Sequence, residues 1–168
     1  MTGKPTPLAQ TLVFGWGNLS RGDDALGPLF VQALRDRHDA DVDVEYLDDY
    51  QLQIEHALDL VGRERVLLVD ASLSCCAPFE VTSVAPRHDT SFATHALSPQ
   101  GLLQVFREVR GEAPPPCTLL QIRGERFELG QPPSCAALNH LAAALQWFST
   151  GVGGAQQPRV GRQLSCFD

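Results

Sequence analysis

The chain has 168 residues, of which 43% are hydrophobic, 20% charged and 7% aromatic, and this is enough apolar material for one ordinary core. Thirteen Lys and Arg against 20 Asp and Glu give a formal net charge of −7, which argues against partners such as nucleic acid or an anionic membrane. The five cysteines include no C-x-x-C pair, which favours reduced thiols in a cytoplasmic protein over a disulfide framework or a zinc ribbon.

The N-terminal run over residues 1–10 is polar, and the apolar stretch behind it is too short for a signal sequence or a membrane span. Short apolar runs then alternate with amphipathic segments, a pattern typical of βαβ units and a mostly parallel sheet. We therefore expect an unexported α/β protein with one domain over residues 1–150 and a flexible tail over residues 151–168.

The first predicted strand covers residues 11–14 and ends at Gly15. A helix with one apolar face follows it. We place the regular start of that helix at Pro28, because proline fits best at the first helical position. This leaves Asp23 and Asp24 in the preceding turn, away from the buried side of the helix.

A second, half-buried strand over residues 42–47 is followed by Asp48 and Asp49, and a weakly helical segment covers residues 52–60. Residues 66–69 form a continuous apolar run that is typical of a central strand, and this run ends on Asp70. The remaining predicted elements are a strand over residues 79–84, a helix that Ser98 and Pro99 open, a strand over residues 118–122 and a last helix from near Ser134.

Acidic residues follow the first three predicted strands, and in a parallel sheet these strand ends lie along one edge. We therefore expect Asp24, Asp48 and Asp70 to meet there, with His95 on a loop of the same edge. Ionised carboxylates this close repel one another unless a cation or a proton lies between them. Carboxylates together with one imidazole suit zinc, nickel or a similar ion better than calcium or magnesium.

Each of these residues also has a purely structural interpretation. Asp23 or Asp24 could be no more than a cap of the first helix, and Asp48 and Asp49 could be no more than turn residues. A loop histidine such as His95 is usually solvated. Asp70 is the exception, because a carboxylate that ends a buried strand needs a hydrogen-bonding or charged partner.

The run Gly-Trp-Gly-Asn over residues 15–18 also raises dinucleotide binding, since glycines after a strand let a backbone approach a pyrophosphate. The match is weak, because Ser20 replaces the third glycine and Asp23 and Asp24 bring negative charge into the turn. No G-x-S-x-G or H-E-x-x-H motif is present, which argues against serine hydrolases and zincins.

Residues 15–18 (Gly-Trp-Gly-Asn) with residues 23–27 (Asp-Asp-Ala-Leu-Gly) resemble the first signature of the hydrogenase maturation proteases. These endopeptidases trim the large subunit of nickel-iron hydrogenases. Residues 44–48, 67–71 and 94–99 resemble the family's second strand, third strand and histidine loop, in the same order. The resemblance covers about residues 11–148.

The resemblance implies a five-stranded twisted sheet with helices on both faces and a site in which Asp24, Asp70 and His95 are both metal ligands and catalytic residues. It implies that the substrate is the large-subunit precursor, cut after nickel insertion, with the substrate's nickel as the recognition signal. No metal is then permanently bound, although zinc, nickel or cadmium is expected to fill the site in vitro. A monomer with no nucleic-acid or membrane partner is expected.

The chain departs from the family pattern after the second strand. Many members have Asp-Gly-Gly-Thr there, whereas residues 48–53 read Asp-Asp-Tyr-Gln-Leu-Gln. The first metal position is often Glu, and here it is Asp24. Residues 51–55 look more like the proteases that serve soluble, NAD-coupled hydrogenases than those that serve membrane-bound ones.

The candidate residues are compatible with two mechanisms. A metal could lower the pKa of bound water and polarise the scissile carbonyl, or it could only dock the substrate, in which case Asp23 or Asp48 would act as general base. A nickel-binding assembly factor without peptidase activity is the alternative function, and a nucleotide-binding module at Gly15 is a second one.

Overall fold

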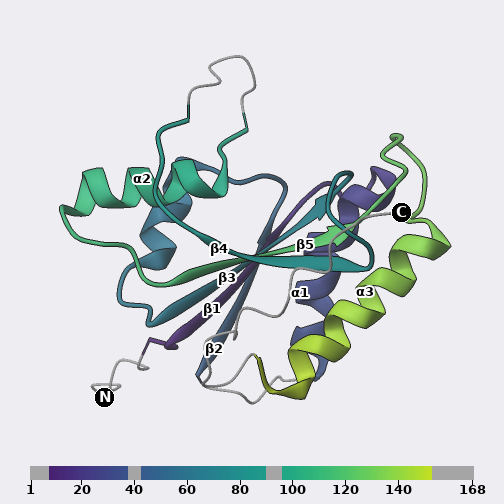
Figure 1. Ribbon diagram of the computed structural model, residues 1–168, viewed down its shortest axis with the longest axis horizontal. Coiled ribbons are helices and arrows are strands. Elements are labelled where there is room, and N and C mark those ends of the chain that lie inside the picture. The colour runs from purple at the N-terminus through teal and green to yellow at the C-terminus, as the bar shows by residue number, and fades with distance from the viewer. Residues whose placement is uncertain (1–7, 38–42, 90–95, 153–168) are drawn as a thin grey trace, which may run out of the picture.

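Five apolar runs of the described residues form one sheet, in the order β2-β1-β3-β5-β4 (Figure 1). The computed structural model describes residues 8–37, 43–89 and 96–152. Strand β4 is antiparallel to β5, and the other neighbouring pairs are parallel, so the predicted mostly parallel α/β fold is confirmed. The strands are β1 (Thr11–Trp16), β2 (Val44–Asp49), β3 (Arg65–Ser72), β4 (Phe79–Val84) and β5 (Cys117–Arg123).

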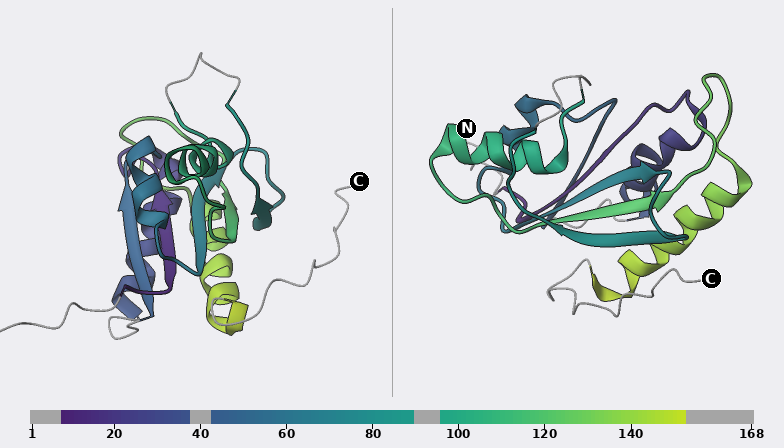
Figure 2. Two further views of the ribbon diagram at one scale, coloured as in Figure 1. Left: turned by 90° about the vertical axis from the view of Figure 1, so that its left-hand side faces the viewer. Right: turned by 45° about the horizontal axis from the view of Figure 1, so that its top comes forward.

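Helices cover both faces of the sheet, as predicted. Helices α1 (Leu26–Arg37) and α3 (Cys135–Trp147) bury their apolar side chains on one face, and α2 (Pro99–Arg110) with the 3-10 helix η2 (Ile54–Leu60) covers the other. The views in Figure 2 show α2 and α3 on opposite sides of the sheet. Side chains of a strand alternate between these two faces, so residue parity decides which helices a strand residue meets.

The strands run further than their apolar runs. Strand β1 continues to Trp16, which pairs with Asp49 of β2, and β3 continues past Asp70, which pairs with Gln121 of β5. Backbone pairing continues at these strand ends because the polar side chains can face the loops while the backbone amides of the same residues stay hydrogen-bonded to the next strand. Asp48, Asp49 and Asp70 therefore lie inside strands and not behind them.

The predicted start of α1 at Pro28 is wrong, because the helix begins two residues earlier. The 3-10 helix η1 (Gly22–Ala25) leads directly into α1 at Leu26, two residues before Pro28. Proline is tolerated there because the first four amides of a helix have no intrahelical acceptor. Asp23 lies in η1 with 0% of its surface exposed, so the expectation that it stays away from the buried side of the helix is also wrong.

The predicted cap at Ser98 and the predicted start of the last helix near Ser134 are confirmed, and Ser134 is also a cap. The Ser98 hydroxyl accepts from the amide of Gly101 at 3.0 Å, and the Ser134 hydroxyl accepts from the amide of Ala137 at 3.1 Å. The segment predicted as weakly helical forms the 3-10 helix η2. The chain continues from α3 into a π-helical turn, η3 (Phe148–Val152), and from residue 153 on the predicted tail lies outside the described residues.

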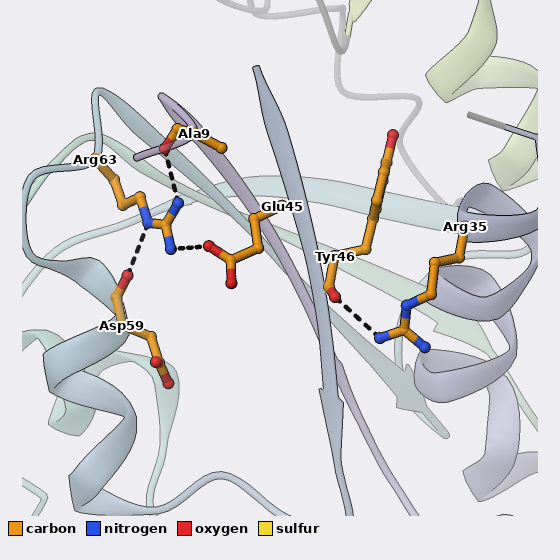
Figure 3. A network of polar contacts seen from close by, with 6 residues as sticks. All are labelled: Ala9, Arg35, Glu45, Tyr46, Asp59 and Arg63. Carbon is orange, nitrogen blue, oxygen red and sulfur yellow. Dashed lines mark hydrogen bonds and ion pairs between the residues drawn. The ribbon is translucent and has the colours of Figure 1, made fainter. Parts of the chain in front are cut away.

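Arg63 holds the residues that precede β1 at the edge of the sheet where the parallel strands begin (Figure 3). Only 4% of its side chain is exposed, and its guanidinium donates to the carbonyls of Asp59 and Ala9 and pairs with Glu45 of β2. A buried guanidinium needs such a set of acceptors to compensate its lost hydration. No helix among the described residues is long and apolar enough to cross a membrane.

Candidate active site at the carboxyl edge of the sheet

The parallel strands β1, β2, β3 and β5 end along one edge, called the carboxyl edge below, where Asp24 and Asp70 come together. Asp70 shares its face of β3 with Leu68, which packs towards α2. Asp24 reaches the same place from η1, and its Oδ2 accepts from the amide of Asn18 at 2.9 Å. Burial raises the pKa of Asp70 to about 7, against a lowering hydrogen bond from Ala71, and the charge of Asp24 adds to the rise.

Close backbone packing explains the glycines of the first motif. A Cβ on Gly17 would lie 1.9 Å from the carbonyl oxygen of Asp24, and Gly17 has a φ of +146°. A Cβ on Gly27 would lie 2.4 Å from the carbonyl oxygen of Trp16. The glycines therefore let η1 and α1 sit against the end of β1, which brings Asp24 to the carboxyl edge, and they leave no open cradle for a pyrophosphate.

Asp23 performs a structural task beside Asp24. Its carboxylate accepts from the amides of Glu125 at 2.8 Å, Arg126 at 3.0 Å and Ser134 at 2.6 Å, and from the Ser134 hydroxyl at 3.0 Å. Burial raises the pKa of Asp23, but these hydrogen bonds outweigh burial and the net pKa is lowered. Four donors around one enclosed carboxylate leave it unsuited to the general-base role considered from the sequence.

Asp48 does not meet Asp24 and Asp70 as expected. It shares its face of β2 with Tyr46, which packs against the core under α1, and it pairs with Arg35 of α1 at 2.7 Å. Arg35 also donates to the carbonyl of Tyr46 at 2.9 Å (Figure 3). Asp48 is therefore on the opposite face of the sheet from Asp70, because one step along a strand reverses the side-chain direction.

Asp49, one residue later, faces the same side as Asp70 and binds His56. The Nε2 atom of His56 lies 3.0 Å from Oδ2 of Asp49, and its Nδ1 accepts from the amide of Gln53 at 2.9 Å. The imidazole also contacts the ring of Phe14, with centroids 4.6 Å apart. Sequence reasoning does not single out His56, because this pairing exists only once η2 folds back over β1 and β2.

His95, the third member of the expected site, lies outside the described residues, which resume at residue 96. In the part of the chain that the structure describes, no three His, Cys, Asp or Glu side chains form a group that could hold a metal ion. The described ends of the segment that carries His95 are joined, because Asp89 accepts from the amide of Ser98 at 3.0 Å and from its hydroxyl.

The buried thiols of Cys75 and Cys117 show no sign of activation. Burial raises the pKa of both, to about 12 for Cys117, and the sulfur of Cys75 lies 3.5 Å from the carbonyl oxygen of Gln121. A nucleophilic cysteine needs the opposite shift. Neither thiol therefore contributes to the candidate site.

The chain is similar to hydrogenase maturation proteases in sequence and in structure. No family model matches it. The Hydrogenase 2 maturation protease of Escherichia coli (strain K12) is 31% identical over 134 residues, which are 76% of this chain and 82% of that protein. This identity over most of both chains is the evidence for a shared family.

Several solved structures share the fold, among them the following two. The [NiFe] hydrogenase maturation protease HycI from Thermococcus kodakarensis KOD1 superposes with a TM-score of 0.67 at 20% identity, over 84% of this chain and 91% of that one. The hydrogenase maturating endopeptidase HybD from E. coli gives a TM-score of 0.63 at 25% identity, over 82% and 88%. Together with the sequence identity above, these similarities show that the chain belongs to the hydrogenase maturation protease family.

Proposed function

We propose that the protein is an endopeptidase that removes the C-terminal extension of a nickel-iron hydrogenase large-subunit precursor after nickel insertion, in the cytoplasm. The observation that carries the proposal is the Asp24 and Asp70 pair, because the family's motifs bring both carboxylates to one edge of the sheet. Membership of a family of proteases supports the hydrolytic activity.

The nickel in the precursor is part of the substrate, and the donor set of this chain fits such an ion. Asp24 and Asp70 are carboxylates close enough for the charge of one to raise the pKa of the other, and a cation at this place would relieve that repulsion. His95 would add an imidazole, and two carboxylates with one imidazole suit nickel or zinc. When bound, the ion would polarise the scissile carbonyl.

The chain's own residues have separate tasks in this proposal. Asp24 and Asp70 hold the substrate's metal and thereby place the peptide bond that follows it. Asn18 orients Asp24 through its amide, and the enclosed Asp23 fixes the element on which Asp24 stands. Binding energy spent on orientation in this way lowers the barrier of the chemical step.

The substrate subtype is proposed to be the precursor of a soluble, NAD-coupled hydrogenase. Residues 51–55 carry this proposal, because their sequence resembles that of the proteases that serve soluble, NAD-coupled hydrogenases. The test is a comparison of cleavage rates on precursors of soluble and of membrane-bound hydrogenases. Faster cleavage of the membrane-bound precursor would contradict the subtype and leave the protease function standing.

The main experiment incubates the purified protein with nickel-loaded and nickel-free large-subunit precursor and reads the products by mass spectrometry. One defined C-terminal cut is expected in the loaded precursor and none in the nickel-free form. Asp70→Asn should lower the cleavage rate at least about 100-fold, whereas the exposed control Asp36→Asn should leave it unchanged.

Absence of cleavage in the loaded precursor would contradict the proposed function. Stable nickel binding by the protein alone, without cleavage, would then favour the nickel-binding assembly factor that the sequence also allows. Full activity of Asp70→Asn would leave the peptidase standing and would remove Asp70 from its site.

A further inference from the structure

A row of side chains crosses three neighbouring strands at the carboxyl edge. Trp16 of β1 pairs with Asp49 of β2, and Gly15 pairs with Val69, the residue before Asp70. Asp49, Trp16 and Asp70 therefore stand at the same level and point to the face that α2 and η2 cover. With strands about 4.8 Å apart, the backbones of Asp49 and Asp70 are about 10 Å apart, with Trp16 between them.

Asp49 is the carboxylate that β2 contributes to this row, and it is partly exposed. Its side chain is 42% exposed, and it accepts from the amide of Tyr50 at 2.6 Å through Oδ1 and from His56 through Oδ2. A carboxylate has about four lone-pair sites, so two remain for a water molecule or a substrate. Asp48 is directed to the opposite face, as described above.

The ring of His56 is held by contacts that direct its Nε2 to the carboxylate of Asp49. Its Nδ1 accepts a backbone hydrogen bond from Gln53, so Nε2 carries the hydrogen of the neutral ring and donates it to Asp49. Only 13% of its side chain is exposed, and the ring lies against Phe14 of β1. Both ring nitrogens are thus occupied, and His56 itself is not available to take a proton from water.

Two further polar residues, Asp59 and Tyr50, lie near Asp49 and His56. Burial raises the pKa of Asp59, an acidic residue of η2 close to this pair. The hydroxyl of Tyr50 turns away towards the β1 loop, where it accepts from the side-chain amide of Asn18 at 3.1 Å. This contact joins the end of β2 to the loop that orients Asp24.

We propose that Asp49 is the general base of the peptide hydrolysis and that His56 is the positioning residue that aims its carboxylate at the water. This inference rests on the proposed endopeptidase function. Asp49 takes one proton from water as the water oxygen bonds to the carbonyl carbon of the scissile peptide. The C–N bond then breaks, and Asp49 returns that proton to the leaving nitrogen, so one water is consumed and Asp49 is regenerated.

The test measures kcat and KM for cleavage of the nickel-loaded precursor. Asp49→Asn should lower kcat at least about 100-fold with KM little changed, because a general base acts only on the chemical step. The matched control is the adjacent Asp48→Asn, which should keep kcat within about twofold. Wild-type kcat in Asp49→Asn would overturn the assignment of the base.

Two variants separate positioning from structure. His56→Phe keeps a ring against Phe14 but removes the donor, and kcat should fall about tenfold with KM unchanged, whereas His56→Gln keeps an N–H donor and should recover part of the rate. Wild-type kcat in His56→Phe, or no difference between the two variants, would overturn the positioning role. Absence of cleavage by the wild-type protein would instead contradict the proposed function itself.

Discussion

Ser134 donates two hydrogen bonds to Asp23, from its amide to Oδ1 at 2.6 Å and from its hydroxyl to Oδ2 at 3.0 Å. The same hydroxyl accepts from Ala137 and caps α3. One buried carboxylate thus ties η1 to the start of α3, although the two residues are 111 positions apart in the chain. The neighbour of Asp23 is Asp24, so the position of a proposed metal ligand depends on this contact.

Replacement of Asp23 by alanine should destabilise the protein by about 3 kcal/mol, because the amides of Glu125, Arg126 and Ser134 would lose their acceptor in a buried place. Urea unfolding followed by circular dichroism measures this change. The exposed control Asp36→Ala should stay within about 0.5 kcal/mol of the wild type. A similarly small effect in Asp23→Ala would show that the Asp23 carboxylate does not hold η1 to the start of α3.

The contribution of Asp23 should also depend on pH. Its pKa in the folded protein lies below the ordinary aspartate value of 3.8, so the folded state favours the ionised form. The stabilisation is therefore complete above about pH 4 and is lost as the pH falls through the folded pKa. Unfolding free energies of the wild type and Asp23→Asn should converge in acid, and a gap that stays constant down to pH 2 would contradict this account.

The contribution of Asp70 to stability should depend on pH with the opposite sign. Its pKa rises from 3.8 to about 7 on folding, so ionised Asp70 destabilises the metal-free fold above pH 7, and the cost disappears as the pH falls towards 3.8. Asp70→Asn should therefore be more stable than the wild type at pH 8, by up to about 4 kcal/mol, and equal to it near pH 3.8. Unfolding at both pH values checks this, and a less stable variant at pH 8 would mean that Asp70 has a structural partner.

Gly27→Ala should disrupt the candidate site through the backbone. The new Cβ would meet the carbonyl oxygens of Trp16 at 2.4 Å and Val69 at 2.8 Å, which belong to the two central strands and cannot move aside cheaply. We expect a loss of at least about 3 kcal/mol in stability, together with loss of cleavage. Gly111→Ala is the control, since its Cβ has no atom within 4 Å and only the φ of +67° opposes it, at a cost of about 1 kcal/mol.

Asp89→Ala should lower activity more than stability. Asp89 holds Ser98 through two hydrogen bonds and so joins the described ends of the segment that carries His95. Without this joint Asp89 and Ser98, the described residues on either side of His95, are no longer held together, and kcat/KM should fall about tenfold. The melting temperature should change by only about 2–4 °C, and Asp89→Asn, which keeps one acceptor, should be intermediate. Unchanged kcat/KM in Asp89→Ala would separate this joint from the function.

The local elements could be predicted because short-range chemistry decides them. Ser98 and Ser134 precede helices in which their hydroxyls satisfy a free amide three residues later, so both helix starts follow from the sequence. The apolar run of β3 and the alternation of β2 are equally local signals. The carboxyl-edge rule then placed Asp24 and Asp70 on the same edge of a parallel sheet.

The sequence by itself therefore determined the α/β order of strands and helices, the starts of α2 and α3 and the edge at which Asp24 and Asp70 lie. Only the tertiary structure decided which of two adjacent aspartates faces that site, because the register of β2 directs Asp48 to Arg35 and Asp49 to His56. It also decided that Asp23 is buried, since its donors lie more than 100 residues away. Contacts between distant segments depend on packing, and no local pattern in the chain records them.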